Sequence, residues 1–186
     1  MRGRGKIVGA MYDFRRRVTL LQTEIEDDFR EQVDALAEKP VSVEVKEWRE
    51  KHTPAERGYY WTLVAQTARR LQISTARLHN TYLRRCSSPD LLGGDVMIVM
   101  LPDTDEAEDD ALEREKFHLK PTGNVREGTR GVDYRAYVVL RGSHSFDKEE
   151  YSRLIDIAVE GASEQGIETA TPDELAKIKE AYKCEV

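Results

Sequence analysis

Residues 53–86 read TPAERGYYWTLVAQTARRLQISTARLHNTYLRRC and contain two successive helical patterns. The first begins with a capping box formed by Thr53 and Glu56, with proline at the first helical position. Ser74 is placed to begin the second. One face of each helix collects residues that favour burial: Tyr60, Leu63, Val64, Thr67, Ala68, Leu71, Leu78, His79, Tyr82, Leu83 and Cys86. The sequence therefore predicts two amphipathic helices, over 53–71 and 74–86.

The opposite faces of these helices are rich in arginine. Residues 51–86 carry seven basic residues and one acidic residue, although the 186-residue chain has a net charge of −6. Guanidinium groups bind phosphate oxygens and stack on bases, so a basic block within an acidic chain indicates an anion-binding surface. The predicted phosphate contacts are Arg69, Arg70, Arg77, Arg84 and Arg85.

Two aromatic residues at the start of the first helix extend this interpretation. Tyr59 and Trp61 do not both fit the buried stripe, so at least one is expected at the surface. An exposed aromatic ring beside arginines is typical of a stacking platform for single-stranded nucleic acid. The alternative is that the aromatics lie in the core and the arginines are simply solvated.

The remaining elements predict an α+β fold. We expect strands at 6–14, 17–25, 41–46, 96–101 and 132–140, and helices at 26–38, from 147 to Gly166, and from 171 onward. This mixed order predicts a single domain over 1–186, with a small mixed or antiparallel sheet and two amphipathic helix pairs packed on it. Residues 142–186 form a predicted C-terminal helical module.

Residues 103–131 are expected to differ from the rest of the domain. An acidic run is followed by a segment that contains glycine and proline, and the whole stretch is read as a mobile insertion. The carboxylates of 103–110 are of the type that magnesium nucleases use, but consecutive carboxylates in a loop are more often a solvated segment.

The sequence gives little support for a metal site, an HNH nuclease or a nucleotide-binding loop. The four histidines (His52, His79, His118 and His144) are scattered and are expected to have structural or surface roles. His79-Asn80 resembles a fragment of an HNH nuclease motif but lacks the accompanying histidines. There is no phosphate-binding glycine loop, and we expect no cofactor and no metal.

The composition predicts a cytoplasmic protein. No apolar run approaches the roughly 20 residues of a membrane span, and no secretory signal is recognised. The two cysteines, Cys86 and Cys184, do not form a CxxC pair and are expected to be reduced.

Two stretches resemble the NinB (lambda Orf-like) recombination proteins of bacteriophages of Gram-positive hosts. One is HTPAERGYYWTLVAQTARRLQIS with the following LHNTYLRR, and the other is HSFDKEEYSRLIDIAVEGASEQGIETATPDEL. The chain departs from the family pattern at Glu56 and Arg57, where relatives have Gln-Asn. The resemblance implies an α+β recombination mediator that is a homodimer, binds single-stranded DNA and contacts a single-strand-binding protein.

The leading hypothesis is therefore a non-enzymatic phage recombination accessory protein in the bacterial host cytoplasm. Two alternatives remain open. One is a protein-interaction module whose arginines capture an acidic peptide tail without binding DNA. The other is a metal-dependent phage nuclease that uses the acidic run.

Overall fold

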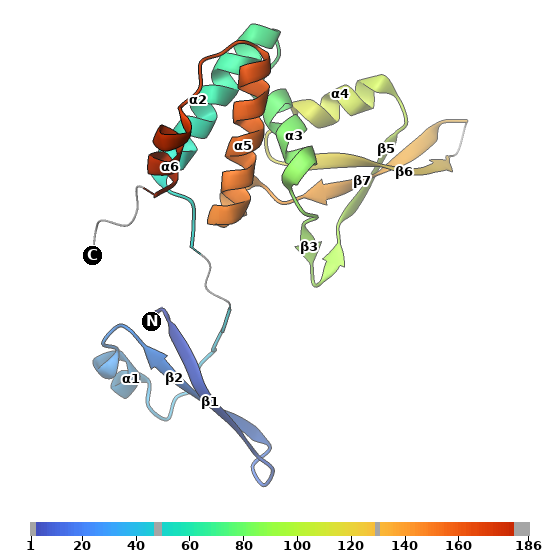
Figure 1. The fold of residues 1–186 in the computed structure, drawn as a ribbon. Coiled ribbons are helices and arrows are strands. Elements are labelled where there is room, and N and C mark those ends of the chain that lie inside the picture. The colour runs from blue at the N-terminus through green and yellow to red at the C-terminus, as the bar shows by residue number, and fades with distance from the viewer. Residues whose placement is uncertain (1–2, 47–49, 129–130, 181–186) are drawn as a thin grey trace. The chain divides into compact units, whose positions relative to one another are not determined.

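The computed structural model describes residues 3–46, 50–128 and 131–180. Helices alternate with small antiparallel sheets, so the predicted α+β class is confirmed (Figure 1). The chain divides into two compact units, Met1–Trp48 and Arg49–Val186, where the sequence predicted one domain.

The first unit is a β-hairpin followed by a short helix. Strands β1 (Gly5–Asp13) and β2 (Val18–Ile25) pair antiparallel, and α1 covers Arg30–Leu36. The strand predicted at 41–46 is wrong, because these residues adopt no strand and their three valines are exposed. Alternating valines favour a strand only where a neighbouring strand accepts their backbone hydrogen bonds.

Four helices dominate the second unit. They are α2 (Pro54–Leu71), α3 (Thr75–Cys86), α5 (Lys148–Glu164) and α6 (Pro172–Glu180). The capping box of Thr53 and Glu56 forms as predicted, and Ser74 caps α3. Helix α5 packs against α2 and α3, and α6 also contacts α2 (Figure 1). Their buried faces form the main core: Tyr60, Leu63, Val64, Ala68, Leu78, Tyr82, Leu83, Leu140, Phe146, Tyr151, Leu154, Ile155, Ala158 and Ala162.

A three-stranded antiparallel sheet lies beside these helices. Its order is β5 (Ile98–Pro102), β7 (Asp133–Leu140) and β6 (His118–Glu127), so β7 is the central strand. Strands β3 (Leu91–Leu92) and β4 (Asp95–Val96) form a separate small hairpin. The apolar run from which a strand at 96–101 was predicted, and which was expected to be buried, forms the edge strand β5, whose side chains from 98 to 100 are exposed.

The stretch predicted to be a mobile insertion is ordered over most of its length. It contains helix α4 (Asp105–Glu113) and strand β6. Helix α4 packs on α3 and β6 over a second apolar cluster that includes Ala111, Leu119 and Tyr137. Three of its acidic residues pair with arginines of α3: Asp109 and Glu113 with Arg77, and Glu108 with Arg84.

No helix among residues 3–46, 50–128 and 131–180 is long and apolar enough to cross a membrane.

Candidate nucleic-acid interface

The arginines of α3 are paired with carboxylates of neighbouring helices. Arg77 Nη2 lies 2.6 Å from Asp109 Oδ1 on α4. Arg84 forms an ion pair with Glu108, and its Nε donates to the backbone oxygen of Leu119 at 2.7 Å. These contacts neutralise two of the five predicted phosphate ligands.

Glu108 is held as a carboxylate by its surroundings. Burial raises the pKa of Glu108, but hydrogen bonds from Tyr137 and Arg84 outweigh burial and leave that pKa below its ordinary value. The Tyr137 hydroxyl donates to Glu108 Oε2 at 2.6 Å. The Arg84–Glu108 pair therefore belongs to the packing of α4 on the sheet.

Arg85 also has a carboxylate partner, but at the surface. Its Nη2 lies 2.5 Å from Glu160 Oε2 on α5, and both side chains are about half exposed. An exposed pair of this kind contributes at most about 1 kcal/mol to stability.

The arginines of α2 differ from those of α3. Arg69 and Arg70, in the last turn of α2, are exposed and form no ion pair with any described residue. Arg57, in the first turn, is likewise exposed and without an ion pair in the described ranges. Of the arginines on α2 and α3, those without an ion pair to a described residue are therefore on α2.

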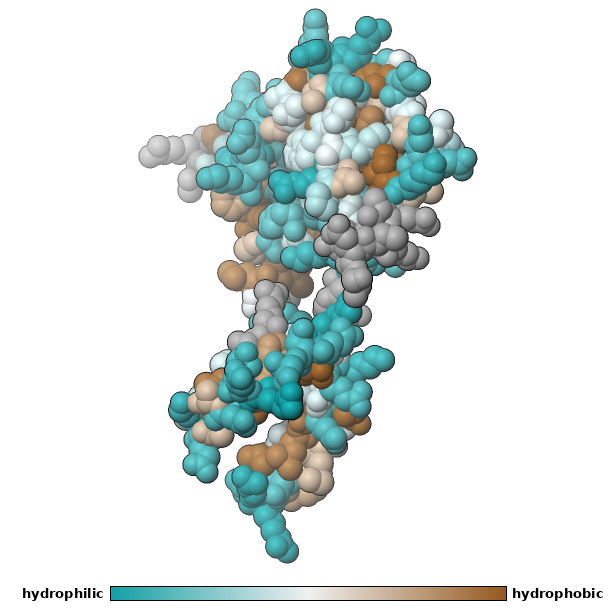
Figure 2. Space-filling model, turned by 90° about the vertical axis from the view of Figure 1, so that its left-hand side faces the viewer, coloured by the Kyte–Doolittle hydropathy of each residue, from teal (hydrophilic) through white to brown (hydrophobic). Residues whose placement is uncertain are grey.

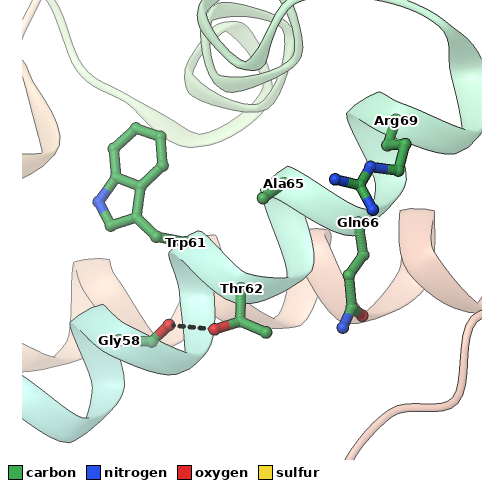
Figure 3. Close-up of a pocket in the computed structure, with 6 residues that line it drawn as sticks. All are labelled: Gly58, Trp61, Thr62, Ala65, Gln66 and Arg69. Atoms are coloured by element: carbon green, nitrogen blue, oxygen red, sulfur yellow. Dashed lines mark hydrogen bonds between the residues drawn. The ribbon is translucent and has the colours of Figure 1, made fainter.

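A hollow of about 460 Å³ runs along the outward face of α2. Its lining residues are spaced as one face of a helix: Gly58, Trp61, Thr62, Ala65, Gln66 and Arg69. Figure 3 shows the Trp61 indole and the Arg69 guanidinium rising on either side of Ala65. Thr62 turns its hydroxyl back to the Gly58 carbonyl at 2.9 Å, which leaves a strip of small side chains beside the indole.

The two predicted aromatic residues have different environments. Trp61 is 37% exposed, and its ring lies 4.8 Å from the His79 ring, centroid to centroid. Tyr59 is half-buried, and its hydroxyl accepts a hydrogen bond from the backbone nitrogen of Ala170 at 2.9 Å. Trp61 is thus available for stacking, whereas Tyr59 anchors the segment before α6.

One side of the second unit is mostly polar. Figure 2 views the molecule from the side that is on the left in Figure 1, where α2 and α6 lie. Hydrophilic side chains surround a paler, weakly polar area in the second unit, and hydrophobic residues appear there as separate small patches.

A second hollow, of about 280 Å³, adjoins the first at Trp61. All four histidines of the chain line it, although they are scattered in the sequence. The complete lining is His52, Arg57, Trp61, His79, Glu115, His118, Ser143, His144 and Tyr151. We call this hollow the histidine pocket.

His79 is held in one neutral form. Its Nδ1 lies 2.6 Å from the Tyr60 hydroxyl. Burial, and secondarily the neighbouring His118, lower the pKa of His79 to about 4, while burial raises that of Tyr60 far above its ordinary value. Because Tyr60 remains a phenol, we assign it as the donor to Nδ1, and the proton of His79 is then on Nε2.

His118 is oriented by Asn80. The Asn80 amide nitrogen donates to the backbone oxygens of Leu112 and Arg114, at 2.6 and 2.8 Å. Its Oδ1 therefore faces His118 Nδ1, 2.6 Å away, and accepts a hydrogen bond from the Nδ1–H group. Burial, with a smaller contribution from His144, lowers the pKa of His118, so its neutral form has an unprotonated Nε2.

Sequence reasoning missed the histidine pocket because its members are far apart in the chain. His52 and His144 each lie shortly before a capping box, at the N-terminal ends of α2 and α5, and both helices begin near the same place. Buried polar residues within a helical stripe, as at His79-Asn80, were the available signal.

Among the described residues, no group of three or more His, Cys, Asp or Glu side chains is arranged to hold a metal ion.

No family model matches this chain, and no curated protein or solved structure is significantly similar to it. The resemblance to NinB-type proteins therefore stays a prediction.

Proposed function

We propose that this protein binds single-stranded nucleic acid along the outward face of α2, without catalysing a reaction. A base stacks on Trp61, and phosphates bind Arg57, Arg69 and Arg70. The observation that carries the proposal is the exposed indole beside a strip of small side chains, with guanidinium groups free of ion pairs at both ends.

The dimensions of the strip suit a strand rather than a single nucleotide. Arg57 and Arg69 are separated by about 18 Å along the helix axis, at 1.5 Å per residue. Stacking of one base on an aromatic ring contributes about 1–3 kcal/mol, and it tolerates any base because every base has a π-face. We therefore expect weak dependence on sequence and strong dependence on salt.

The arginines of α3, which the sequence predicted to bind phosphate, contribute less to binding in this proposal. Arg77 and Arg84 are occupied by carboxylates of α4, and Arg85 by an exposed carboxylate of α5. Of these three, Arg85 has the most exposed side chain, and its pair is the easiest to exchange for a phosphate.

The resemblance to NinB-type proteins supports a more specific version. In it the protein is a phage recombination accessory protein in the bacterial host cytoplasm, which acts as a homodimer and contacts a single-strand-binding protein. The hairpin of the first unit leaves Ile7, Met11 and Leu21 about half exposed or more. A two-stranded hairpin gains stability from a partner surface, which a second copy of the chain would provide.

The test is the salt dependence of oligonucleotide binding by fluorescence anisotropy. Each phosphate contact that is lost lowers the log–log slope by roughly 0.7 for a single strand. We expect that decrease for Arg57→Ala and for Arg69→Ala. Arg77→Ala is the matched control, because Asp109 holds the Arg77 guanidinium, and it should leave the slope nearly unchanged. The reverse pattern would contradict the assignment to α2.

A parallel titration with an acidic peptide distinguishes a peptide ligand from a nucleic-acid ligand. Arginines that capture a peptide tail need no stacking platform, so Trp61→Ala would leave peptide binding intact. If an acidic peptide binds and an oligonucleotide does not, the nucleic-acid proposal is wrong.

A further inference from the structure

The histidine pocket is more polar than packing alone requires. Tyr151 is 1% exposed, lines the pocket, and has a buried hydroxyl with no hydrogen-bond partner among the described residues. Its ring stacks on His52 at 3.9 Å between centroids. A buried hydroxyl without a partner costs about 1–3 kcal/mol. Because the Tyr151 side chain borders the hollow, a ligand there could accept a hydrogen bond from this hydroxyl.

We propose that the histidine pocket is a phosphate-binding site, filled by a phosphate of the strand that stacks on Trp61. The source of the phosphate rests on the proposed function, but the affinity of the pocket for a phosphate group does not.

The donors of the pocket come from several elements. Arg57 supplies a guanidinium from the first turn of α2, and Tyr151 supplies its hydroxyl from α5. His79, on α3, carries its proton on Nε2, because Nδ1 accepts from Tyr60. A phosphate offers three or four acceptor oxygens in different directions and therefore suits donors that converge from separate elements.

Charge in the pocket also favours an anion. The titratable groups that line it are His52, Arg57, His79, Glu115, His118, His144 and Tyr151. Glu115 is the only carboxylate in the lining, and it is exposed. The buried carboxylate of Glu56 also acts on Tyr151, and the Arg57 guanidinium opposes its effect. Burial raises the pKa of Tyr151, so its hydroxyl stays a donor at neutral pH.

His118 gives the site a dependence on pH. Its Nδ1 is committed to Asn80, so any added proton goes to Nε2. A bound phosphate stabilises the charged imidazolium and raises the pKa of His118 above its lowered value in the free protein. An anion of constant charge, such as a phosphodiester, therefore binds more tightly as the pH falls through the pKa of His118 in the complex.

Gly142 keeps two histidines close together. A Cβ at this position would lie 2.8 Å from His144 Nδ1 and 3.3 Å from His118 Nε2. The φ angle of Gly142 is −74°, which alanine adopts readily, so Gly142→Ala should displace His144 without straining the backbone.

The experiment titrates the full chain with inorganic phosphate at constant ionic strength, at pH 6 and pH 8, and follows the histidine ring protons by NMR. We expect the His118 and His144 resonances to shift with a saturable curve at both pH values. Acetate at the same concentrations should not reproduce the curve. Shifts that stay linear in phosphate, or an equal curve with acetate, would overturn the proposal.

Three variants make the test specific. Tyr151→Phe removes a hydroxyl that has no described partner and should weaken phosphate binding about tenfold while the protein stays folded. Tyr82→Phe is the matched control, because its hydroxyl is buried against Gly161 and lies outside the pocket lining. Gly142→Ala should also weaken binding. Equal affinity in wild type, Tyr151→Phe and Gly142→Ala would refute the site.

A second arm separates the two proposals. The same protein is titrated with an oligonucleotide that carries a 5′-phosphate and with one that lacks it. If phosphate binds but neither oligonucleotide does, the pocket stands and the proposed function fails. If oligonucleotides bind and phosphate does not, the proposed function stands and the phosphate site is wrong. A preference for the phosphorylated end would identify the terminal phosphate as the occupant.

Discussion

Arg84 and Arg85 are neighbours in the sequence, yet their replacement by alanine should have very different effects. The Arg84 side chain is 16% exposed and binds both Glu108 and the carbonyl of Leu119. Arg85 is 49% exposed, and its partner Glu160 is 54% exposed. Loss of one partner from a fully buried ion pair costs about 3–5 kcal/mol, and loss from an exposed pair costs about 0–1 kcal/mol.

The Arg84 pair lies between these limits, because Glu108 is 34% exposed. We therefore expect Arg84→Ala to lower the free energy of unfolding by about 2 kcal/mol, and Arg85→Ala by less than about 0.5 kcal/mol. For a unit of this size the first change corresponds to a fall in Tm of about 4–8 °C.

The assay is urea unfolding followed by Trp61 fluorescence, with Trp48 replaced by phenylalanine so that the reporter lies within α2. The double variant Arg84→Ala, Glu108→Gln should be less destabilised than the sum of its single changes, because the two side chains interact directly. Equal effects of Arg84→Ala and Arg85→Ala would refute the structural role assigned to Arg84. So would a decrease in oligonucleotide salt slope for Arg84→Ala without loss of stability.

Three further changes test the surroundings of the site. The folded pKa of His79 is about 4 against an ordinary 6.5, so about 3 kcal/mol of stability present above pH 6.5 is lost as the pH falls toward 4. Urea midpoints measured from pH 7.5 to 4.5 should fall less steeply in His79→Gln, and equal slopes would contradict a buried neutral imidazole. Tyr59→Phe removes the bond to Ala170 and should destabilise the protein by about 1 kcal/mol, as measured by thermal unfolding, with unchanged oligonucleotide affinity. Burial raises the pKa of Cys86 to about 11. In a Cys184→Ser variant at pH 8, Ellman's reagent should therefore react with Cys86 about 100-fold more slowly than with a thiol of pKa 9. A normal rate would show that the Cys86 thiol is accessible.

The helices of the second unit were predictable because their signals are local. Thr53 bonds to Glu56, and Asp147 to Glu150, within one helical turn, so the helix starts can be read from the sequence. The strand expected at 41–46 failed because alternation of valines says nothing about the presence of a partner strand. Local patterns identified the helices here more reliably than they identified the sheets.

The environment of the predicted arginines could not be read from the sequence. Arg77 and Arg84 meet carboxylates of α4 that lie more than 20 residues further along the chain. The acidic run looks self-repelling by itself, and becomes an ordered helix only when the opposite charges of α3 face it. The same holds for the four histidines, which meet only because the starts of α2, α5 and β6 come together at α3.

Trp61 fluorescence during titration with a single-stranded oligonucleotide tests the central claim most directly. Trp48 is replaced by phenylalanine, which leaves Trp61 as the one tryptophan of the chain. Stacking of a base on the indole predicts strong, saturable quenching at low salt that weakens as salt is added, and that is reduced in Arg69→Ala. Binding detected by anisotropy without any change in Trp61 emission would contradict the account.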